Sequence, residues 1–531
     1  MKVTAGEVVI VGAGLAGLVA ALELLDQGMV ATVIDRDGPE AIGGLARESF
    51  GGLLLVDTPA QRRNRIADSP ERALADWRRF GELTEADRWP LAWAASYVEH
   101  SRVGIHDWLA GMGQRFLPLP LWVERDGNSV PRWHVCWGTG AGLVARILAA
   151  IDAHPNRARL TLRFGTRIER LITEAGRVVG VTGQDEATGA EVTIRAPRVV
   201  IAAGGITGDD AQVRAHWHRD WQPAPPVILN GAHRFGDGTL HRAAQAAGGR
   251  VTHLDRQWNY AGGIRHWAPR KPRHGLSLVP ARTAVWVDAT GARVMPPMLT
   301  GFDTRALVTQ LCALPGGYGW QIMNRRIALK ELAVSGAEMN PALRDASRLR
   351  FLRDILLGNR WLYDTLTTRA PDVVTAATLP RLAAAMNALD GPGPAVDPDL
   401  LVQSVASFDA EIARGPATTD PQLTAIRQMR DWRGDKMRLT NGVRILDAQG
   451  GPLVAIRTFV IARKSLGGIV TDLAARVLDA GDAPIPGLYA VGEAAGFGGG
   501  NANGLRGLEG TFLGGAIHTA RRLAAAIRQG D

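Results

Sequence analysis

The sequence is poor in cysteine and has no long apolar run, and each shortage excludes a class of protein. Only Cys136 and Cys312 occur among 531 residues, so the chain has no disulfide framework and no C-x-x-C metal or redox pair. No uninterrupted, glycine-poor apolar stretch is long enough to span a bilayer. We therefore expect a cytoplasmic protein with no metal site and no integral membrane segment.

Positive charge is present but nowhere concentrated. The formal net charge is +9, and the basic residues are mostly arginines spread along the chain, without a basic run or interleaved aromatics. This spread argues against a nucleic-acid partner, while an anionic substrate or an acidic partner stays open. A hydrophobic fraction of 46% and a charged fraction of 21% are ordinary for a globular protein, and 531 residues predict two or three domains.

The first forty residues carry the most informative motif. The apolar run Val8–Val11 predicts a buried parallel strand, and a G-x-G-x-x-G turn follows it at Gly12, Gly14 and Gly17. In such a turn the first glycine permits the tight bend, the second lets a pyrophosphate approach, and the third lets the next helix pack on the strand. A second strand then ends at Asp35, where an acid binds ribose hydroxyls. Together these features predict a dinucleotide site.

Two other interpretations of this segment are weaker. A glycine-rich turn of an unrelated α/β protein would not require the strand, turn, helix, strand and acid to follow in this order. A signal peptide is disfavoured by Glu7, Glu23 and Asp26 and by the lack of a small-residue cleavage site.

The rest of the chain divides by pattern. Alternating segments at 159–163, 166–172, 177–182 and 191–195 predict an antiparallel meander, and the apolar run 199–205 predicts another parallel strand.

Residues 253–461 carry amphipathic segments such as 341–367 and 379–389 without a second G-x-G-x-x-G motif, which indicates an inserted domain. Residues 484–493 predict a turn and a strand. Seven glycines within 496–510 predict a loop whose backbone approaches a planar or charged group.

Together these pieces resemble the FAD-binding flavoproteins of the fumarate reductase, succinate dehydrogenase and 3-ketosteroid dehydrogenase superfamily. The motifs that carry the resemblance are Gly12-x-Gly14-x-x-Gly17, Gly43-Gly44, Val199-Val-Ile-Ala-Ala-Gly-Gly205 and Gly487-Leu-Tyr-Ala-Val-Gly-Glu493. More narrowly, the chain is similar to the group called FAD-binding dehydrogenases, through the segments 49–63, 127–140, 301–304 and 463–468. The name of that group specifies a cofactor and a reaction class but no substrate.

The resemblance implies a non-covalent FAD site, because no histidine lies within 43–52 to form the histidyl link of some relatives. It implies FAD contacts from Gly12, Ala13, Gly14 and Gly17 at the pyrophosphate, Asp35 and Arg36 at the adenosine ribose, Gly43, Gly44, Ser49, Gly51 and Gly52 on the path to the flavin, Ala203 and Gly204 under the dinucleotide, Gly492 and Glu493 at the ribityl chain, and Leu508, Glu509 and Thr511 at the flavin. Ser49 has an equal interpretation as a turn hydroxyl. A helix starting near 508–511 would stabilise the negative charge of reduced flavin at its N1 and C2 carbonyl edge.

Four residues are candidates for the chemistry of flavin desaturation, which needs a base and a group that polarises the activating carbonyl or carboxylate. Arg506 stands where fumarate reductases place an arginine for a substrate carboxylate; its alternative is a loop-packing or FAD contact. Lys464 and Ser465 stand where those enzymes carry a histidine pair, so fumarate itself is disfavoured, and Lys464 is either a carbonyl-polarising group or a surface lysine. Tyr318 is an acid–base candidate, and His134 is a candidate for a position facing the flavin. The alternative for each is a residue of the core.

We expect an α/β protein in which a Rossmann-like FAD-binding domain, 1–252 and 462–531, carries an inserted α+β substrate or cap domain, 253–461, with the site in the crevice between them. The expected reaction is hydride transfer at flavin N5 that desaturates or reduces a C–C bond beside a carbonyl or carboxyl of a hydrophobic small molecule, ketosteroid-like compounds among them. Two alternatives stay open: a relay flavoprotein that needs a separate electron acceptor or donor, and a flavin amine oxidase or hydroxylase.

Overall fold

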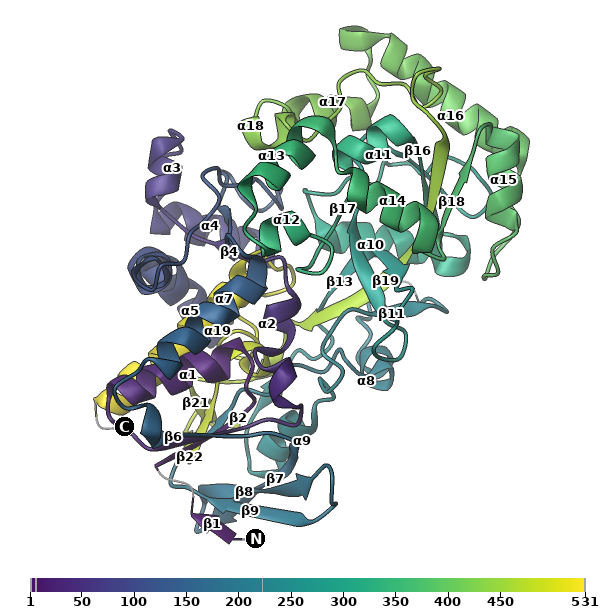
Figure 1. Ribbon diagram of the computed structural model, residues 1–531. Helices are drawn as coiled ribbons and strands as arrows, with labels where there is room; N and C mark the ends of the chain where they lie inside the picture. The colour runs from purple at the N-terminus through teal and green to yellow at the C-terminus, as the bar shows by residue number, and fades with distance from the viewer. Residues whose placement is uncertain (1, 5–6, 222, 530–531) are drawn as a thin grey trace. The chain divides into compact units, whose positions relative to one another are not determined.

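A six-stranded sheet organises the first part of the computed structural model, which describes residues 2–4, 7–221 and 223–529 (Figure 1). In spatial order its strands are β21 (Arg476–Leu478), β22 (Pro484–Ala490), β10 (Val199–Ile201), β2 (Val8–Val11), β3 (Ala31–Ile34) and β6 (Leu160–Arg163). All neighbours run parallel except β21, which is antiparallel to β22. The Rossmann-like α/β fold predicted from the sequence is therefore confirmed.

Strand β2 is apolar throughout because both faces of the sheet are covered. Val8 and Ile10 belong to a core shared with three helices, whereas Val9 and Val11 belong to a core shared with a second, smaller sheet. The helices are α1 (Leu15–Asp26), α7 (Thr139–Asp152) and α19 (Thr511–Arg528). A strand buried on both faces cannot alternate in polarity, which explains the continuous apolar run.

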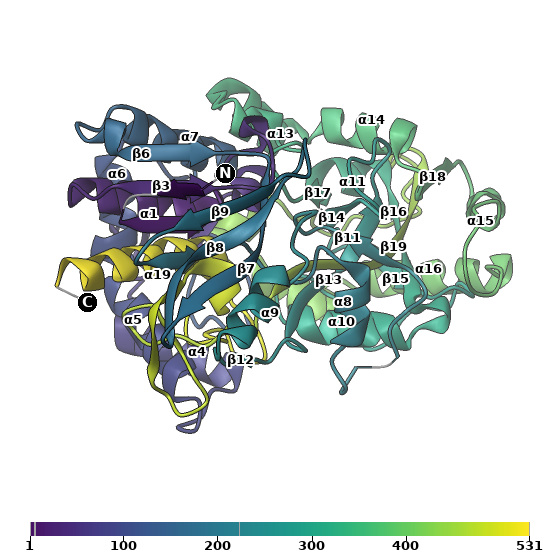
Figure 2. The ribbon, with the colours of Figure 1, turned by 90° about the horizontal axis from the view of Figure 1, so that it is seen from below.

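The smaller sheet is the predicted meander with one change in membership. Its strands are β1 (Lys2–Thr4), β9 (Glu191–Arg195), β8 (Arg177–Asp185) and β7 (Thr166–Glu174), and Figure 2 shows the last three running together as a long, twisted ribbon. Residues 160–163 are not part of it: Leu160 pairs with Ala31, so this segment is an edge strand of the parallel sheet. Alternating polarity fits both positions, and only the pairing partner distinguishes them.

The remaining elements of this first unit are short or helical. They are η1 (Pro39–Ala41), α2 (Gly44–Glu48), β4 (Gly52–Leu54), α3 (Pro59–Arg63), α4 (Pro70–Gly81), α5 (Arg88–His100), the π-helix η2 (Ser101–Asp107), α6 (Trp108–Gly111), β5 (Trp133–Val135), η3 (Arg157–Arg159), α8 (Asp210–Ala215), α9 (Thr239–Ala246), β12 (Val251–Thr252), β20 (Gly468–Ile469) and η6 (Gly492–Ala495). Strand β4 pairs with β5, and β12 pairs with β20.

A mixed sheet with helices forms a second unit around its own core. Its strands are β11 (Ile228–Asn230), β13 (Gln257–Arg265), β14 (Gly275–Val279), β15 (Val285–Val287), β16 (Tyr318–Asn324), β17 (Ala333–Val334), β18 (Val373–Ala376) and β19 (Leu453–Ser465). Its helices are α10 (Thr304–Ala313), η4 (Pro315–Gly317), α11 (Arg325–Glu331), α12 (Pro341–Arg344), α13 (Arg348–Leu357), α14 (Arg360–Arg369), α15 (Leu379–Asn387), α16 (Pro398–Ala413), η5 (Gly415–Ala417), α17 (Pro421–Met429) and α18 (Arg433–Lys436). The amphipathic segment 341–367 is thus three helices, separated at 345–347 and 358–359.

Contacts divide the chain into unit 1, residues 1–218, 232–258 and 464–531, and unit 2, residues 219–231 and 259–463. Strands β13 and β19 run from one unit into the other. In the described part of the chain, no helix combines the length and the apolar character needed to cross a membrane.

Candidate FAD site in unit 1

The turn between β2 and α1 has the packing that its glycine spacing predicts. A Cβ atom on Gly12 would overlap the carbonyl of Ala202, and one on Gly17 would overlap the carbonyl oxygen of Gly12. Gly14 is the N-cap of α1, and a Cβ added there would meet nothing within 4 Å. Two glycines therefore pack the turn, while the third faces open space beside the N–H groups of a helix N-terminus, which favour a phosphate.

Asp35 ties the end of β3 to this turn. One carboxylate oxygen accepts a hydrogen bond from the Ala13 N–H at 2.6 Å, and the other accepts one from the Asp37 N–H at 2.8 Å. A carboxylate oxygen has a second lone pair for a further donor. The contact of Asp35 with a ribose stays a prediction, and the structure shows that this residue also positions the turn.

Arg36 is held by acidic and aromatic neighbours. Its guanidinium pairs with Glu186 at 2.5 Å and with Asp237 at 3.2 Å, and it lies over the Phe235 ring, 4.0 Å from the ring centroid. These contacts fix the side chain next to Asp35. A role of Arg36 at the adenosine ribose stays a prediction.

The second glycine pair lies directly against the first turn. The Gly43 N–H donates to the Ala13 carbonyl at 2.9 Å, and Gly14 and Gly43 form a parallel bridge. A Cβ on Gly44 would meet only the Gly14 Cα atom, at 3.5 Å. Residues thirty positions apart therefore form one surface.

Ala203 and Gly204 follow β10 at the carboxyl end of the parallel strands. A Cβ on Gly204 would meet nothing within 4 Å. Gly14, Gly44 and Gly204 are thus backbone positions with open room, which is what close approach of a phosphate-bearing planar group requires. On this test the described residues fit FAD.

The segment from Ser49 to Gly52 packs closely against the rest of unit 1. Ser49 Oγ donates to the Ala46 carbonyl at 2.7 Å and closes α2. A Cβ on Gly51 would overlap the backbone at the start of α7, and one on Gly52 would overlap the Trp133 indole. Ser49 therefore has the turn role that was its alternative, and contact between this segment and FAD stays a prediction.

Gly492 lies between α1 and α19. Its N–H donates to Thr519 Oγ1 at 2.9 Å, and a Cβ added to it would lie 2.8 Å from the Cβ of Ala16. The end of β22 is thereby placed beside the first turn of α1. The residues implied at the pyrophosphate and at the ribityl chain belong to one continuous region of unit 1.

Glu493 joins this region to the end of β19. Its Oε1 accepts a hydrogen bond from the Ser465 N–H at 2.9 Å, and Ser465 Oγ accepts one from the Ile206 N–H at 2.9 Å. A Cβ on Gly205 would overlap both the Glu493 carboxylate and the Ser465 hydroxyl. Both residues are visible in the sequence, but their contact depends on the tertiary structure.

The start of α19 is packed against β4. Gly510 is its N-cap, and a Cβ there would overlap the Leu54 nitrogen. Thr511 Oγ1 lies 2.6 Å from the Leu508 carbonyl oxygen and 2.8 Å from Asn503 Oδ1. These contacts fix the helix N-terminus at the position where the resemblance places the flavin edge.

Lys464 lies at this same helix end. Its Nζ is 4.0 Å from the centroid of the Phe512 ring, and Phe512 is the second residue of α19. The Trp258 ring lies 6.1 Å from that of Phe512, and Trp258 Nε1 donates to Glu509 Oε1 at 3.0 Å. Lys464 therefore lies beside the implied flavin edge. Trp258 was missed, since a lone tryptophan at the start of a strand carries no motif.

Arg506 faces the end of α4. It forms an ion pair with Glu82, and its guanidinium is 5.9 Å from the centroid of the Phe80 ring. The neighbouring Leu505 N–H donates to the Gly81 carbonyl at 2.8 Å. The Arg506 side chain remains 22% exposed, so a ligand oxygen could compete with Glu82.

His134 is a buried structural residue. Its Nε2 lies 2.8 Å from Thr58 Oγ1 and its Nδ1 lies 2.7 Å from the Arg132 carbonyl oxygen. Burial lowers the pKa of His134 to about 3. Both ring nitrogens are engaged within the protein, so we leave His134 out of the proposed chemistry.

Tyr318 lies in the core of unit 2, where it starts β16. Its ring packs 5.8 Å from Phe459 and 6.3 Å from Trp320, and burial raises the pKa of its hydroxyl. These contacts support the role of a core aromatic, which was the alternative for this residue.

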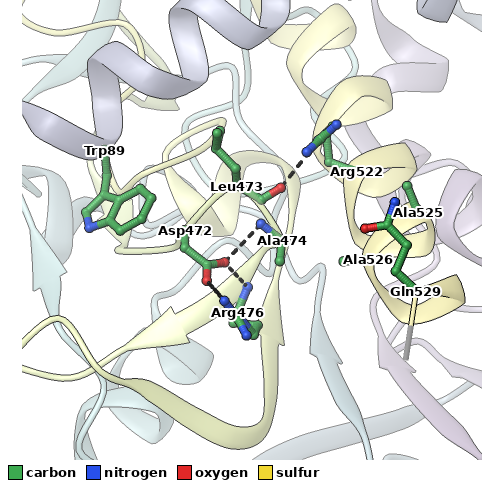
Figure 3. Close-up of a pocket in the computed structure, with 9 residues that line it drawn as sticks. All are labelled: Trp89, Asp472, Leu473, Ala474, Arg476, Arg522, Ala525, Ala526 and Gln529. Atoms are coloured by element: carbon green, nitrogen blue, oxygen red, sulfur yellow. Dashed lines mark hydrogen bonds and ion pairs between the residues drawn. The ribbon is translucent and has the colours of Figure 1, made fainter. Parts of the chain in front are cut away.

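A pocket of about 360 Å³ lies elsewhere in unit 1 (Figure 3). It is lined by Trp89, the 472–476 loop and the last two turns of α19 from Arg522 onward, with Asp472 and Arg476 paired at 2.7 Å. A helix rises 1.5 Å per residue, so Arg522 lies about 17 Å along α19 from Thr511. This pocket is therefore separate from the implied flavin edge at Thr511.

The chain belongs to the FAD-binding flavoproteins. The family model described as FAD binding domain matches residues 7–513. The protein is accordingly a FAD-dependent dehydrogenase or reductase, as the resemblance implies.

Two relatives are similar over nearly the whole chain. A KsdD-like steroid dehydrogenase of Mycobacterium tuberculosis is 40% identical over 97% of this chain and 94% of that protein. Another KsdD-like steroid dehydrogenase, from Mycolicibacterium smegmatis, is 39% identical over 96% of each chain.

Solved structures show the same fold at lower identity. The 3-ketosteroid Δ1-dehydrogenase of Sterolibacterium denitrificans, in complex with 1,4-androstadiene-3,17-dione, has a TM-score of 0.72 and 18% identity, with 100% of each chain covered. A flavocytochrome c3 fumarate reductase in an open conformation has a TM-score of 0.70 and 20% identity, covering 100% of this chain and 79% of that one.

Proposed function

We propose that the protein desaturates, or in the reverse direction reduces, a C–C bond beside the carbonyl of a steroid-like substrate, using non-covalently bound FAD. The observation that carries this proposal is the 40% identity to a KsdD-like steroid dehydrogenase over 97% of the chain. When bound, FAD supplies the hydride acceptor or donor at N5. The residues of the chain bind FAD and the substrate, orient the two, and polarise the substrate carbonyl.

Non-covalent binding is supported by the nucleophiles that the chain offers. Residues 43–52 contain no histidine. Cys136 and Cys312 are both buried, and burial raises the pKa of the Cys312 thiol to about 12. A thiol without thiolate character is a poor nucleophile for a flavin link.

We assign Lys464 the role of polarising the substrate carbonyl. Its ammonium is held over Phe512, in the first turn of α19, where Leu508–Thr511 are proposed to face the flavin. A cation beside a carbonyl oxygen stabilises the enolate-like charge that develops during proton removal.

We propose Arg506 as a second group that binds a substrate oxygen. The substrate oxygen would replace the Glu82 carboxylate as the partner of the guanidinium. The arginine fork suits a carboxylate or an enolate oxygen, and the Glu82 pair keeps it ordered without substrate. Glu82 sits on the surface, where an ion pair contributes little stability, so exchange of partners costs little.

The test is an anaerobic absorbance titration of the purified flavoprotein. Oxidised protein receives saturated 3-ketosteroids, and dithionite-reduced protein receives ring enones and fumarate. We expect bleaching by a ketosteroid or reoxidation by an enone, and no response to fumarate. A bound flavin that responds to none of these compounds would instead favour the relay alternative.

Two variants test the residues. Lys464→Met is expected to lower turnover about 100-fold or more with full flavin content, because one polarising group is worth that much, whereas Lys436→Met, at an exposed lysine of α18, should change nothing. Arg506→Ala should abolish turnover while FAD stays bound. Full activity of either site variant removes its substrate role, and loss of FAD from Arg506→Ala moves that residue to the cofactor site.

A further inference from the structure

Helix α13 of unit 2 presents its leucines to solvent. The exposed fractions are 84% for Leu349, 54% for Leu352, 73% for Leu356 and 77% for Leu357, and no residue of the helix is buried. Single exposed leucines are ordinary, but four on one ten-residue helix form a patch that marks an interaction surface.

Three of these leucines form one stripe. Positions 349, 352 and 356 are spaced i, i+3 and i+7, which places them within about 60° of the helix circumference. Leu357 lies about 80° from Leu349 on the same side. We call residues 349, 352, 356 and 357 the leucine stripe.

Arginines border the leucine stripe on both sides. At about 100° per residue, Arg350 follows it on one side and Arg348 lies on the other, while Arg353 lies between Leu349 and Leu357. The acid of the helix, Asp354, pairs with Arg353 at 2.9 Å. Within the described residues Arg348 and Arg350 form no ion pair, so the border carries net positive charge.

The opposite side of α13 is fixed to the rest of unit 2. Phe351 and Ile355 are half-buried there, and Lys330 Nζ of α11 donates to the Ile355 carbonyl at 3.0 Å. Helix α13 contacts α11 and α12, and the three lie together in Figure 1. The helix is therefore a surface element of unit 2 with its apolar side outward.

We propose that α13 is an interfacial helix that docks the protein on an anionic lipid bilayer. Lying flat, it would place the leucine stripe among the acyl chains and the bordering arginines at the level of the phosphates. A second copy of the chain fits less well, because a two-fold contact through this surface would bring arginines against arginines. The proposal concerns membrane docking and does not rest on the proposed reaction.

The test is co-sedimentation of the full flavoprotein with lipid vesicles. We expect binding to vesicles of mixed phosphatidylcholine and phosphatidylglycerol that weakens with salt, and weaker binding to pure phosphatidylcholine. The triple variant Leu349→Gln, Leu352→Gln, Leu356→Gln should lose roughly tenfold or more in affinity, because its apolar contact is removed. Arg348→Gln with Arg350→Gln should also bind more weakly and with a smaller salt effect.

The matched control is Val103→Gln with Leu446→Gln, which removes exposed apolar side chains outside α13 and should bind like the wild type. Flavin content and thermal midpoint verify that each variant is folded. Wild-type protein that ignores anionic vesicles, or a triple variant that binds them fully, overturns the proposal. So does a wild-type dimer that the triple variant turns into monomer without any vesicle binding.

Discussion

Two glycine-rich turns of unit 1 resemble each other in sequence. They differ in which neighbouring atoms leave no room for a side chain at the glycine positions. In the turn after β2, the atom that excludes a side chain at Gly17 is the carbonyl oxygen of Gly12, five residues away, although Gly12 itself lies against the remote Ala202 carbonyl. In the loop 496–510, a local obstacle exists at Gly496, which meets the Gly500 backbone. Most of the others come from remote segments: Trp93 at Gly498, Gly81 at Gly504 and Leu54 at Gly510.

The difference explains why one turn is a motif and the other is not. A requirement that arises within a few residues must recur at a fixed spacing, so it is visible in any single sequence. A requirement imposed by α4, α5 and β4 depends on tertiary packing. Glycine count alone then indicates a close approach but does not name the partner.

The largest expected effect is in the first turn. Gly17→Ala forces α1 away from β2 because the new Cβ overlaps the Gly12 carbonyl, and we expect a loss of about 3 kcal/mol or more together with loss of FAD. Gly14→Ala is the matched control: its φ is −70° and its Cβ meets nothing, so the apoprotein should keep its stability while FAD affinity falls. Urea unfolding measures the stability of each variant, and the flavin-to-protein ratio measures its FAD binding. Equal effects of both variants would contradict the distinction between packing and cofactor glycines.

A somewhat smaller effect is expected in the second loop. Gly510 has a φ of +97° and lies against Leu54, so Gly510→Ala combines backbone strain with overlap, at a cost of about 2–3 kcal/mol. Gly189→Ala, in the turn before β9, has a φ of +68° and open space, so it should cost only about 1 kcal/mol. Both are measured by urea unfolding. A Gly189→Ala loss as large as that of Gly510→Ala would show that strain, and not packing against β4, sets the requirement.

The smallest effect is a pH dependence that belongs to the second region. His518 of α19 is buried beside Trp93, and its Nε2 lies 3.0 Å from Ser96 Oγ. Burial lowers the pKa of His518 from 6.5 to about 3. The stability it contributes is complete above pH 6.5 and is lost as the pH falls toward 3, by at most about 1.4 kcal/mol per pH unit.

Comparing pH 7 with pH 5 tests this sign. Wild-type protein should lose up to about 2 kcal/mol more than His518→Gln over that interval. Hydrogen exchange should report the loosening first near 496–510, since Gly498 packs on Trp93, and not in the turn Gly12–Gly17. An identical pH profile for both proteins would remove His518 as the source.

Much of the fold was accessible from local pattern. The strands at 8–11, 199–201 and 484–490 and the closing helix were all predicted, because buried parallel strands and amphipathic helices leave a local signature. The segment 160–163 was placed in the meander because alternation does not reveal which strand it pairs with. The chemical candidates were harder: His134 and Tyr318 carry suitable groups, and only their packing shows that they serve the core.

The sequence by itself determined the cofactor class, since the glycine turn, Asp35 and the paired glycines act through spacing along a few residues. Tertiary structure alone decided which side chains surround the start of α19, where Lys464, Trp258 and Glu509 arrive from distant positions. It also decided that Arg506 meets Glu82 and that the leucines of α13 face outward. Spacing is a local property, whereas burial and partnership depend on where remote segments of the chain pack.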